Sequence, residues 1–152
     1  MSREQGAAGS RSLARLEALA VRQGLSLGVM ASGSPSDFDL VLAAAGCAFA
    51  EGEKLSERDV NERLKLFLQG AGAMMGVDHV ELRRWLVDNA VLARDGFGRE
   101  YTRSAPRAEI ARAMADLSGH DLATLVSGAR TRDAERRAAR KREWQQKAQG
   151  AA

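Results

Sequence analysis

Residues 55–102 read LSERDVNERLKLFLQGAGAMMGVDHVELRRWLVDNAVLARDGFGREYT, and this stretch decides the fold. It predicts two helices, each preceded by a residue that can cap it. Ser56 precedes a helix over Glu57 to Gln69, and an acidic residue three positions after the serine completes a capping-box-like pattern. Asp78 precedes the second helix, whose apolar side chains recur at spacings of three and four. A glycine-rich, flexible turn is expected between the two helices.

After Asn89 the periodicity changes from that of a helix to that of two short strands. Val91 to Arg94 and Arg99 to Thr102 flank the sequence Asp-Gly-Phe-Gly, whose glycines are expected to supply the positive φ of a tight hairpin. Helix, turn, helix, hairpin is the order of a winged helix. We therefore expect a mainly α fold with a small β-hairpin, in which residues 37–104 form a winged-helix-like domain with helical extensions on both sides.

The N-terminal extension is expected to contribute one helix. Residues 1–10 are rich in Gly, Ala and Ser and are expected to be disordered. Residues 11–36 predict an amphipathic helix that ends at Gly24, followed by a loop. Ser36 or Asp37 can then cap an apolar helix that belongs in the core.

The C-terminal extension is expected to contain two helices. Residues 105–127 predict a helix with Pro106 in its first turn. Residues 128–152 predict a basic tail, helical over about Asp133 to Ala148 and exposed to solvent because few of its residues are apolar.

Charge is distributed unevenly along the chain. Up to Ser104 the sequence has 13 basic and 14 acidic residues, whereas from Ala105 onward it has 10 basic and 6 acidic ones. The positive excess is concentrated in Gly128 to Ala148 and predicts attraction to phosphates or to an acidic partner.

Other classes of protein have little support in the sequence. The composition, 45% hydrophobic and 28% charged, is ordinary for a globular protein. No apolar run approaches the roughly 20 residues of a membrane span, and no secretion signal is present, so the expected location is cytoplasmic. Cys47 is the single cysteine, and His79 and His120 lie far apart in the sequence. This pattern predicts no metal ligands, no cofactor and no catalytic site.

A longer motif then carries a family resemblance. It combines Leu-Arg-Arg-x-Leu-Val-Asp at residues 82–88 with Leu-x-Arg at 92–94 and Gly-x-x-Tyr at 98–101, after an earlier block that contains Leu55, Ser56, Glu57, Val60, Asn61 and Leu64. With these residues, the segment from Leu55 to Thr102 resembles a bacterial domain of unknown function, numbered 2087, whose members often look like small transcriptional regulators. The loop over residues 69–77 is longer than usual, and Asn89-Ala90 replaces the usual aromatic residue and glycine.

In a winged helix the second of these helices would be the recognition helix and the hairpin its wing, so we expect duplex DNA as the partner. The candidate contacts are basic: Arg83, Arg84, Arg94, Arg99 and Arg103 in the domain, and Arg136, Arg137, Arg140 and Lys141 in the tail. An alternative is that Arg83 and Arg94 form ion pairs with neighbouring carboxylates.

A second hypothesis is a protein-interaction module with the same shape and no enzymatic activity. Its contacts would be the apolar or aromatic residues expected to be exposed, which are Val80, Val87, Phe97 and Trp144. Periodicity also leaves a homodimer open.

Overall fold

The computed structural model describes residues 2–97 and 99–151. Within them the elements follow in the order α1 (Ser2–Ala20), α2 (Leu27–Gly33), α3 (Pro35–Gly46), β1 (Lys54–Ser56), α4 (Glu57–Gln69), α5 (His79–Asp88), β2 (Leu92–Arg94), β3 (Glu100–Arg103), α6 (Ala108–Leu117) and α7 (Leu122–Gly150). The expected mainly α fold with a small hairpin is confirmed.

The elements from α3 to β3 have the topology of a winged helix. The three strands form an antiparallel sheet in the order β1-β3-β2, in which Leu55 of β1 pairs with Tyr101 and Arg94 of β2 pairs with the same tyrosine from the other side. Strand β1 was not predicted. It has three residues, of which only Leu55 is buried, and so it is too short to show the alternation that marks a strand.

The two helices that the sequence predicts most clearly begin where expected. Ser56 accepts a hydrogen bond from the backbone amide of Asp59 at 3.1 Å, and Asp78 accepts one from that of Glu81 at 2.8 Å. Each capping side chain satisfies an amide that has no partner within its helix. The boundaries of α4 and α5 are therefore fixed by local sequence.

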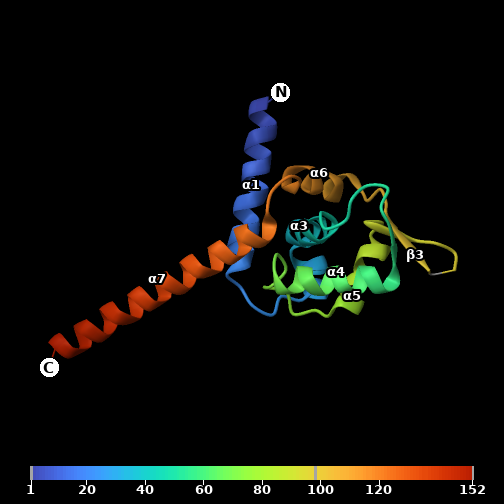
Figure 1. The fold of residues 1–152 in the computed structure, drawn as a ribbon. Helices are drawn as coiled ribbons and strands as arrows, with labels where there is room; N and C mark the ends of the chain where they lie inside the picture. The colour runs from blue at the N-terminus through green and yellow to red at the C-terminus, as the bar shows by residue number, and fades with distance from the viewer. Residues whose placement is uncertain (1, 98, 152) are drawn as a thin grey trace.

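One hydrophobic core unites the domain with its extensions. Leu16 and Leu19 of α1, Tyr101 of β3 and Val126 of α7 belong to the same cluster of buried side chains. Figure 1 shows the body of the protein on one side of α1, while the N-terminal part of α1 and most of α7 extend away from it. The extensions are thus part of the fold and not separate units.

The N-terminal region contains more helix than expected. Ser2–Ser10, which we expected to be disordered, are the first turns of α1, because a helix that is anchored by packing extends at the cost of only one residue's entropy per added hydrogen bond. The expected loop before the core helix contains α2, whose Leu27 and Met30 are buried. The core helix α3 begins with Pro35 after Ser34, two or three residues earlier than predicted.

The C-terminal region has two helices that are divided differently from the prediction. Helix α6 begins at Ala108 after the cap residue Arg107, so Pro106 precedes the helix and the prediction that it lies in the first turn is wrong. The helix ends at Leu117 as expected, and Gly119 (φ +80°) follows it. Helix α7 begins at Leu122 and continues for 29 residues, so the expected boundary at residue 128 lies inside a helix. The first turns of α7 bury Leu122 and Val126, which the charge pattern of the tail did not reveal.

Two turns differ in conformation from the prediction. Gly96 in the hairpin is outside the left-handed region, and Gly98 lies outside the described residues. The loop between β2 and β3 is five residues long, so it does not need the primed turn that a two-residue loop would require. Ala90, by contrast, has φ +58° directly after α5, at the position where the resembling family usually has glycine.

The turn between α4 and α5 is ordered by contacts with the segment that follows α1. Met74 and Met75 are buried, Leu25 donates its amide to the Met74 carbonyl at 3.0 Å, and the Gly76 amide donates to the Leu25 carbonyl at 2.8 Å. A Cβ atom on Gly76 would lie 2.9 Å from the backbone of Gly24. Glycine therefore permits the close approach of two backbones here, and the expected flexible turn is wrong.

Candidate nucleic-acid interface

The sheet register shows which face of the sheet carries Arg94. Partners in an antiparallel pair project to one face of the sheet, so Arg94 lies on the face of Tyr101 and Leu55. That face is the one that packs against the body, because Leu55 and Tyr101 are buried. Arg94 is the last residue of β2 and is exposed to solvent.

Three arginines of this region have exposed guanidinium groups that form no contacts holding the described part of the chain together. Arg84 on α5, and Arg94 and Arg99 beside the wing loop, are exposed, and none of their guanidinium groups takes part in a hydrogen bond or ion pair among the described residues. The backbone amide of Arg99 does donate to Asp95 Oδ1 at 2.8 Å, which orders the loop. We name Arg84, Arg94 and Arg99 the wing cations.

Arg83, next to Arg84 in the sequence, has a different environment. Its side chain is 18% exposed, donates to Asn61 Oδ1 and lies 3.3 Å from Glu57 Oε1. Tyr101 of β3 donates to the same carboxylate oxygen at 3.3 Å. These four residues, the Glu57 cluster, join α5 and β3 to α4. Arg83 therefore forms an ion pair within the fold, with a carboxylate of α4, and its predicted contact with DNA stays a prediction.

Arg103 is also used within the fold. It donates to the Phe49 carbonyl at 3.2 Å, is 4.0 Å from Glu51 Oε1 and is 25% exposed. Its position on the buried face of β3 follows from the alternation with Tyr101. The DNA contact at Arg103 stays a prediction, for a side chain that already has partners within the fold.

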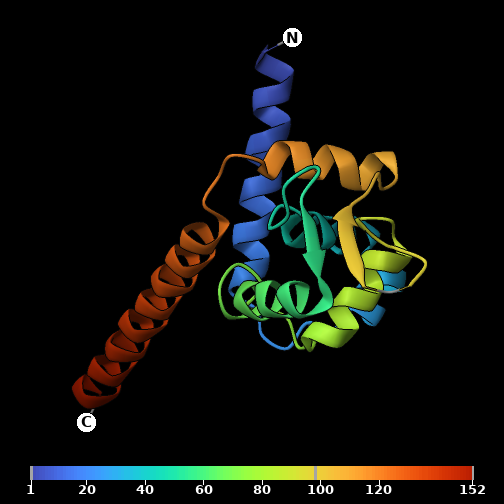
Figure 2. The same ribbon diagram turned by 45° about the vertical axis from the view of Figure 1, so that its right-hand side comes forward.

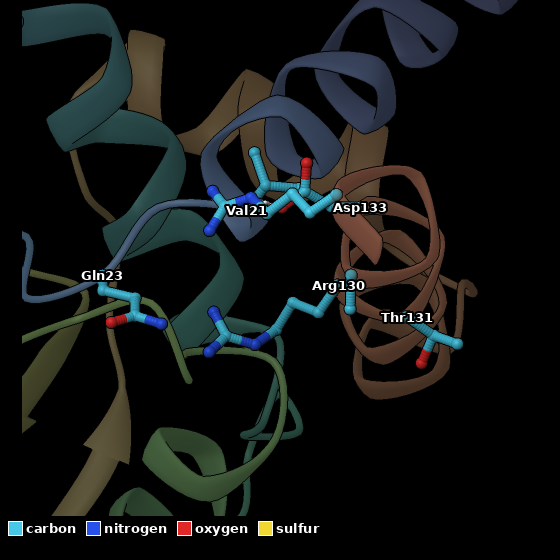
Figure 3. Close-up of a pocket in the computed structure, with 7 residues that line it drawn as sticks. Val21, Gln23, Arg130, Thr131 and Asp133 are labelled. Carbon is cyan, nitrogen blue, oxygen red and sulfur yellow. Dashed lines mark ion pairs between the residues drawn. The ribbon is translucent and has the colours of Figure 1, made fainter. Parts of the chain in front are cut away.

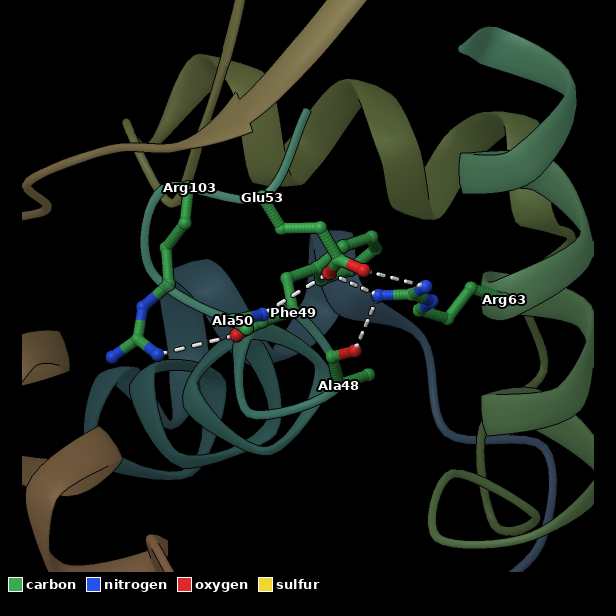
Figure 4. Close-up of polar contacts among 6 residues, drawn as sticks. All are labelled: Ala48, Phe49, Ala50, Glu53, Arg63 and Arg103. Atoms are coloured by element: carbon green, nitrogen blue, oxygen red, sulfur yellow. Dashed lines mark hydrogen bonds and ion pairs between the residues drawn. The ribbon is translucent and has the colours of Figure 1, made fainter. Parts of the chain in front are cut away.

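The loop between α3 and β1 is fixed by two arginines (Figure 4). Besides Arg103, Arg63 of α4 donates to the Ala48 carbonyl at 3.2 Å and to Glu53 Oε2 at 3.0 Å, and its guanidinium lies 5.4 Å from the centre of the Phe49 ring. The hydrogen bonds from Arg63 and from the backbone amide of Ala50 lower the pKa of Glu53. The Glu53 carboxylate is therefore favoured in its ionised form, and its ion pair with Arg63 holds the loop before β1 against α4.

The candidate protein-binding residues do not form one surface. Phe97 at the wing is 86% exposed and Val80 on α5 is 40% exposed, but Val87 is half-buried and packs against the core. Trp144 is 71% exposed on α7. Figures 1 and 2 place the outer part of α7 and the hairpin on opposite sides of the body.

The basic tail is divided between anchoring and exposed cations. Arg130 donates to the carbonyls of Ala20 at 2.7 Å and Arg22 at 3.2 Å, so it occupies the negative end of α1, and Figure 3 shows it reaching from α7 toward the segment after α1. Arg132 donates to Glu17 at 3.1 Å. These two arginines fix α7 across α1.

The predicted tail contacts begin one turn beyond the anchors. Arg136 and Arg137 lie 3.9 Å and 2.9 Å from the two carboxylate oxygens of Asp133. Arg140 and Lys141 are exposed, and the described residues include no ion-pair partner for either.

Cys47 has the environment of a packed residue. Its thiol donates to the Met114 carbonyl at 3.6 Å, and burial raises its pKa against the smaller opposing effect of Arg103. This basic neighbour of Cys47 was not predicted, because Arg103 lies 56 positions further along the chain.

None of the helices in the described ranges has the length and apolar character needed to cross a membrane.

Sequence reasoning missed the acceptors that engage Arg83. Glu57 and Asn61 are four residues apart and so share one face of α4, and both belong to the family motif. An acid and an amide on one face of α4, in the same motif as an Arg-Arg pair, were the signal in the sequence. The sequence does not show, however, that α4 and α5 lie close enough for these side chains to meet.

These elements define a winged-helix-type domain in which an ion pair joins α5 to α4 and a hydrogen bond joins β3 to the same glutamate of α4. The flanking helices complete its core. Residues 33–103 match the family described as "Uncharacterized protein conserved in bacteria (DUF2087)". The match extends the resemblance seen in residues 55–102 to include α3. No curated protein and no solved structure matches the chain.

Proposed function

We propose that this protein binds duplex DNA with α5 and the wing, as a cytoplasmic bacterial transcriptional regulator or accessory DNA-binding protein. The observation that carries the proposal is the set of wing cations. Arg84, Arg94 and Arg99 are exposed around one winged-helix surface, whereas the nearby Arg83 and Arg103 are engaged in the fold. Arginines left in solvent beside a helix and a hairpin are suited to phosphate oxygens and base edges.

The composition of α5 indicates what kind of binding to expect. Its exposed face carries Glu81 and Asp88 beside Arg84, so it offers one cation for the major groove. Phosphate contacts from the wing then supply most of the affinity, which should be strongly dependent on salt. Arg84 is the residue best placed to read a base, since bidentate contact with guanine is the commonest specific contact of arginine.

The proposal is tested by fluorescence anisotropy with a labelled 30-base-pair duplex across a salt series. Neutralising two wing cations, R84Q/R94Q, should reduce the magnitude of the slope of log K against log salt by about 1.8, since each lost phosphate contact accounts for about 0.9. The matched control is R11Q/R112Q, which removes two exposed arginines of α1 and α6. Equal slopes for the two variants, or no binding by the parent protein at low salt, would contradict the proposal.

A second candidate is a protein-interaction module that uses the wing. The exposed Phe97 favours it, because a phenyl ring in solvent at a loop tip is a common anchor in protein interfaces. Normal DNA binding by F97A, together with loss of a binding protein that the parent captures, would support this candidate.

A further inference from the structure

The outer half of α7 is a long helix without tertiary packing. The last buried residue of α7 is Ala129, and the side chain of Asp133 is 18% exposed. From Ala134 to Gly150 every residue is exposed except the half-buried Ala139. These 17 residues would extend for about 25 Å at 1.5 Å per residue. Packing does not explain why this segment is helical and basic.

Four of the six cations of this segment, Arg136, Arg137, Arg140 and Lys147, lie on one side of the helix. At 100° per residue, Arg136, Arg140 and Lys147 fall within about 40° of one another. Trp144 and Arg137 continue the same side of the helix, and Lys141 lies at its border, beside Ala134. The opposite side carries alanine and glutamine together with one cation, namely Ala134, Ala138, Gln145, Gln149 and Arg142. Glu143 lies at the edge of the basic side and Glu135 lies away from it, so residues 134–150 have six basic and two acidic side chains. We name this side the α7 basic face.

The direction of the basic face is set by the anchored half of α7. Leu122, Val126 and Ala129, which are buried against the body, fall on the same side of the helix as Arg140 and Lys147. Arg130 and Arg132 hold that side onto α1. Beyond the end of α1, the same side is left in solvent. The anchors thus present a preformed basic face, which costs no helix nucleation when a ligand binds.

Charge complementarity identifies a polyanion as the ligand of this face, and duplex DNA is the polyanion that fits it best. A helix with side chains is about 10–12 Å wide, close to the width of the major groove, and continuous basic helices of other DNA-binding proteins lie there. About 25 Å of helix corresponds to roughly seven base pairs at 3.4 Å each.

We propose that the α7 basic face is a second DNA-binding surface, which lets one molecule hold two duplex segments. Figures 1 and 2 both place the outer part of α7 on the opposite side of the body from the hairpin. The inference rests on the proposed DNA binding by the wing, since bridging needs both surfaces.

The test is a bridging assay with the full-length protein. A biotinylated duplex on beads captures a second, fluorescent duplex only if the protein joins them, and anisotropy with one duplex measures simple binding in parallel. The variant R140Q/K141Q/K147Q should lower bridging by about tenfold or more while the wing still binds a single duplex. Circular dichroism checks that the helix is retained, because glutamine and arginine have similar helix propensities.

A matched pair of single variants tests the face itself. Arg140 and Arg142 are two residues apart on the same exposed helix but point about 160° apart. We expect R140Q to reduce the salt slope by about 0.9 and R142Q to leave it nearly unchanged. Equal effects would mean that the tail attracts DNA without a defined face, and would overturn the inference.

The outcomes distinguish failure of this inference from failure of the proposed function. If bridging survives the triple α7 variant and is lost in R84Q/R94Q, the α7 surface is refuted and the wing is supported. If R84Q/R94Q has no effect and the α7 variant abolishes all binding, wing binding is refuted and α7 is the only DNA contact, so the two-surface proposal also fails. Binding of a poly-glutamate peptide but of no duplex would assign the α7 face to an acidic protein and overturn both.

Discussion

The adjacent arginines Arg83 and Arg84 should have opposite effects when each is replaced by methionine, which keeps the length and apolar character of the stem. Arg83 joins α5 to Asn61 and Glu57 of α4, whereas Arg84 is exposed and has no ion pair among the described residues. We expect R83M to lower the stability of the protein without removing a DNA contact. We expect R84M to do the reverse.

The size of the R83M effect follows from the contacts that are lost. A hydrogen bond that involves a charged group contributes about 1.5–3 kcal/mol, and the ion pair to the half-exposed Glu57 adds less than about 1 kcal/mol because solvent screens it. The loss of unfolding free energy should be about 2 kcal/mol. For a chain of this size, each kcal/mol corresponds to a melting-temperature change of about 2–4 °C, so R83M should melt about 4–8 °C lower. R84M should melt within about 1 °C of the parent, as is usual for an exposed position.

Urea denaturation and calorimetry give the stability, and the salt dependence of DNA binding gives the contact. R84M should reduce the magnitude of the slope of log K against log salt by about 0.9, and R83M should leave the slope unchanged at a temperature where it is fully folded. The reasoning is refuted if R83M is as stable as the parent and reduces the slope. In that case Arg83 would be free to reach phosphate, and the Glu57 cluster would not hold the wing in solution.

Four further predictions concern stability and reactivity. D37N should lose about 2 kcal/mol at pH 7, because Asp37 accepts two hydrogen bonds from Arg15, which lower its pKa. This stability is present above the unfolded pKa of about 3.9 and is lost as the pH falls through the lower folded pKa, so the unfolding free energies of parent and variant should converge as the pH is lowered below the unfolded pKa; a constant difference would contradict the assignment. A90G should raise the unfolding free energy by about 1 kcal/mol, since Ala90 has φ +58°, a left-handed conformation that glycine adopts without strain. A lower melting temperature of A90G would show that the methyl group of Ala90 stabilises the fold by more than the backbone strain destabilises it. G46A should lose about 1–3 kcal/mol in urea denaturation, because a Cβ there would lie 2.8 Å from side chains of α6 and of the residue before β2; unchanged stability would mean that these side chains move aside. Alkylation of Cys47 should be slower in the folded protein than in urea, and its rate should rise at higher pH in the folded protein than in urea, because burial raises the pKa of the thiol; equal rates would show an open site.

The sequence predicts the winged-helix segment well because its signals are local. Ser56 and Asp78 are capping residues that act on amides three positions away, and Leu82 and Leu86 share one helical face, so each boundary follows from a few neighbouring residues. Strand β1 has no such local signal. Three residues form a strand only because β3 provides partners about 46 positions further along the chain.

The site could be predicted only in part because its arginines are distinguished by tertiary partners. Arg83, Arg84 and Arg103 look alike as basic residues of a motif, and the difference between them depends on which carboxylates and carbonyls lie nearby in space. Alternation along β3 indicates that Arg103 shares the face of the buried Tyr101, and this local signal could have removed it from the candidates. For Arg83 the signal is weaker, because α5 had to be placed beside α4 before Glu57 could be identified as its partner.

The arginines of α7 are also divided into those that have partners within the fold and those that are exposed to solvent. In α7 this division links folding to the proposed DNA binding. The Arg130 guanidinium donates hydrogen bonds to carbonyl groups at the end of α1 and is therefore engaged within the fold. Arg132 pairs with Glu17, one helical turn before that end. If α7 were anchored only by its apolar residues, it could rotate about its axis, since Leu122, Val126 and Ala129 are followed by no further buried side chain. The two arginine contacts restrict that rotation and so determine which side of the outer helix meets the solvent. Replacing Glu17 with glutamine should therefore weaken the distinction between R140Q and R142Q in DNA binding while leaving the charge of α7 itself unaltered. If the distinction persists in the Glu17→Gln background, the apolar seam alone is sufficient to orient the basic face.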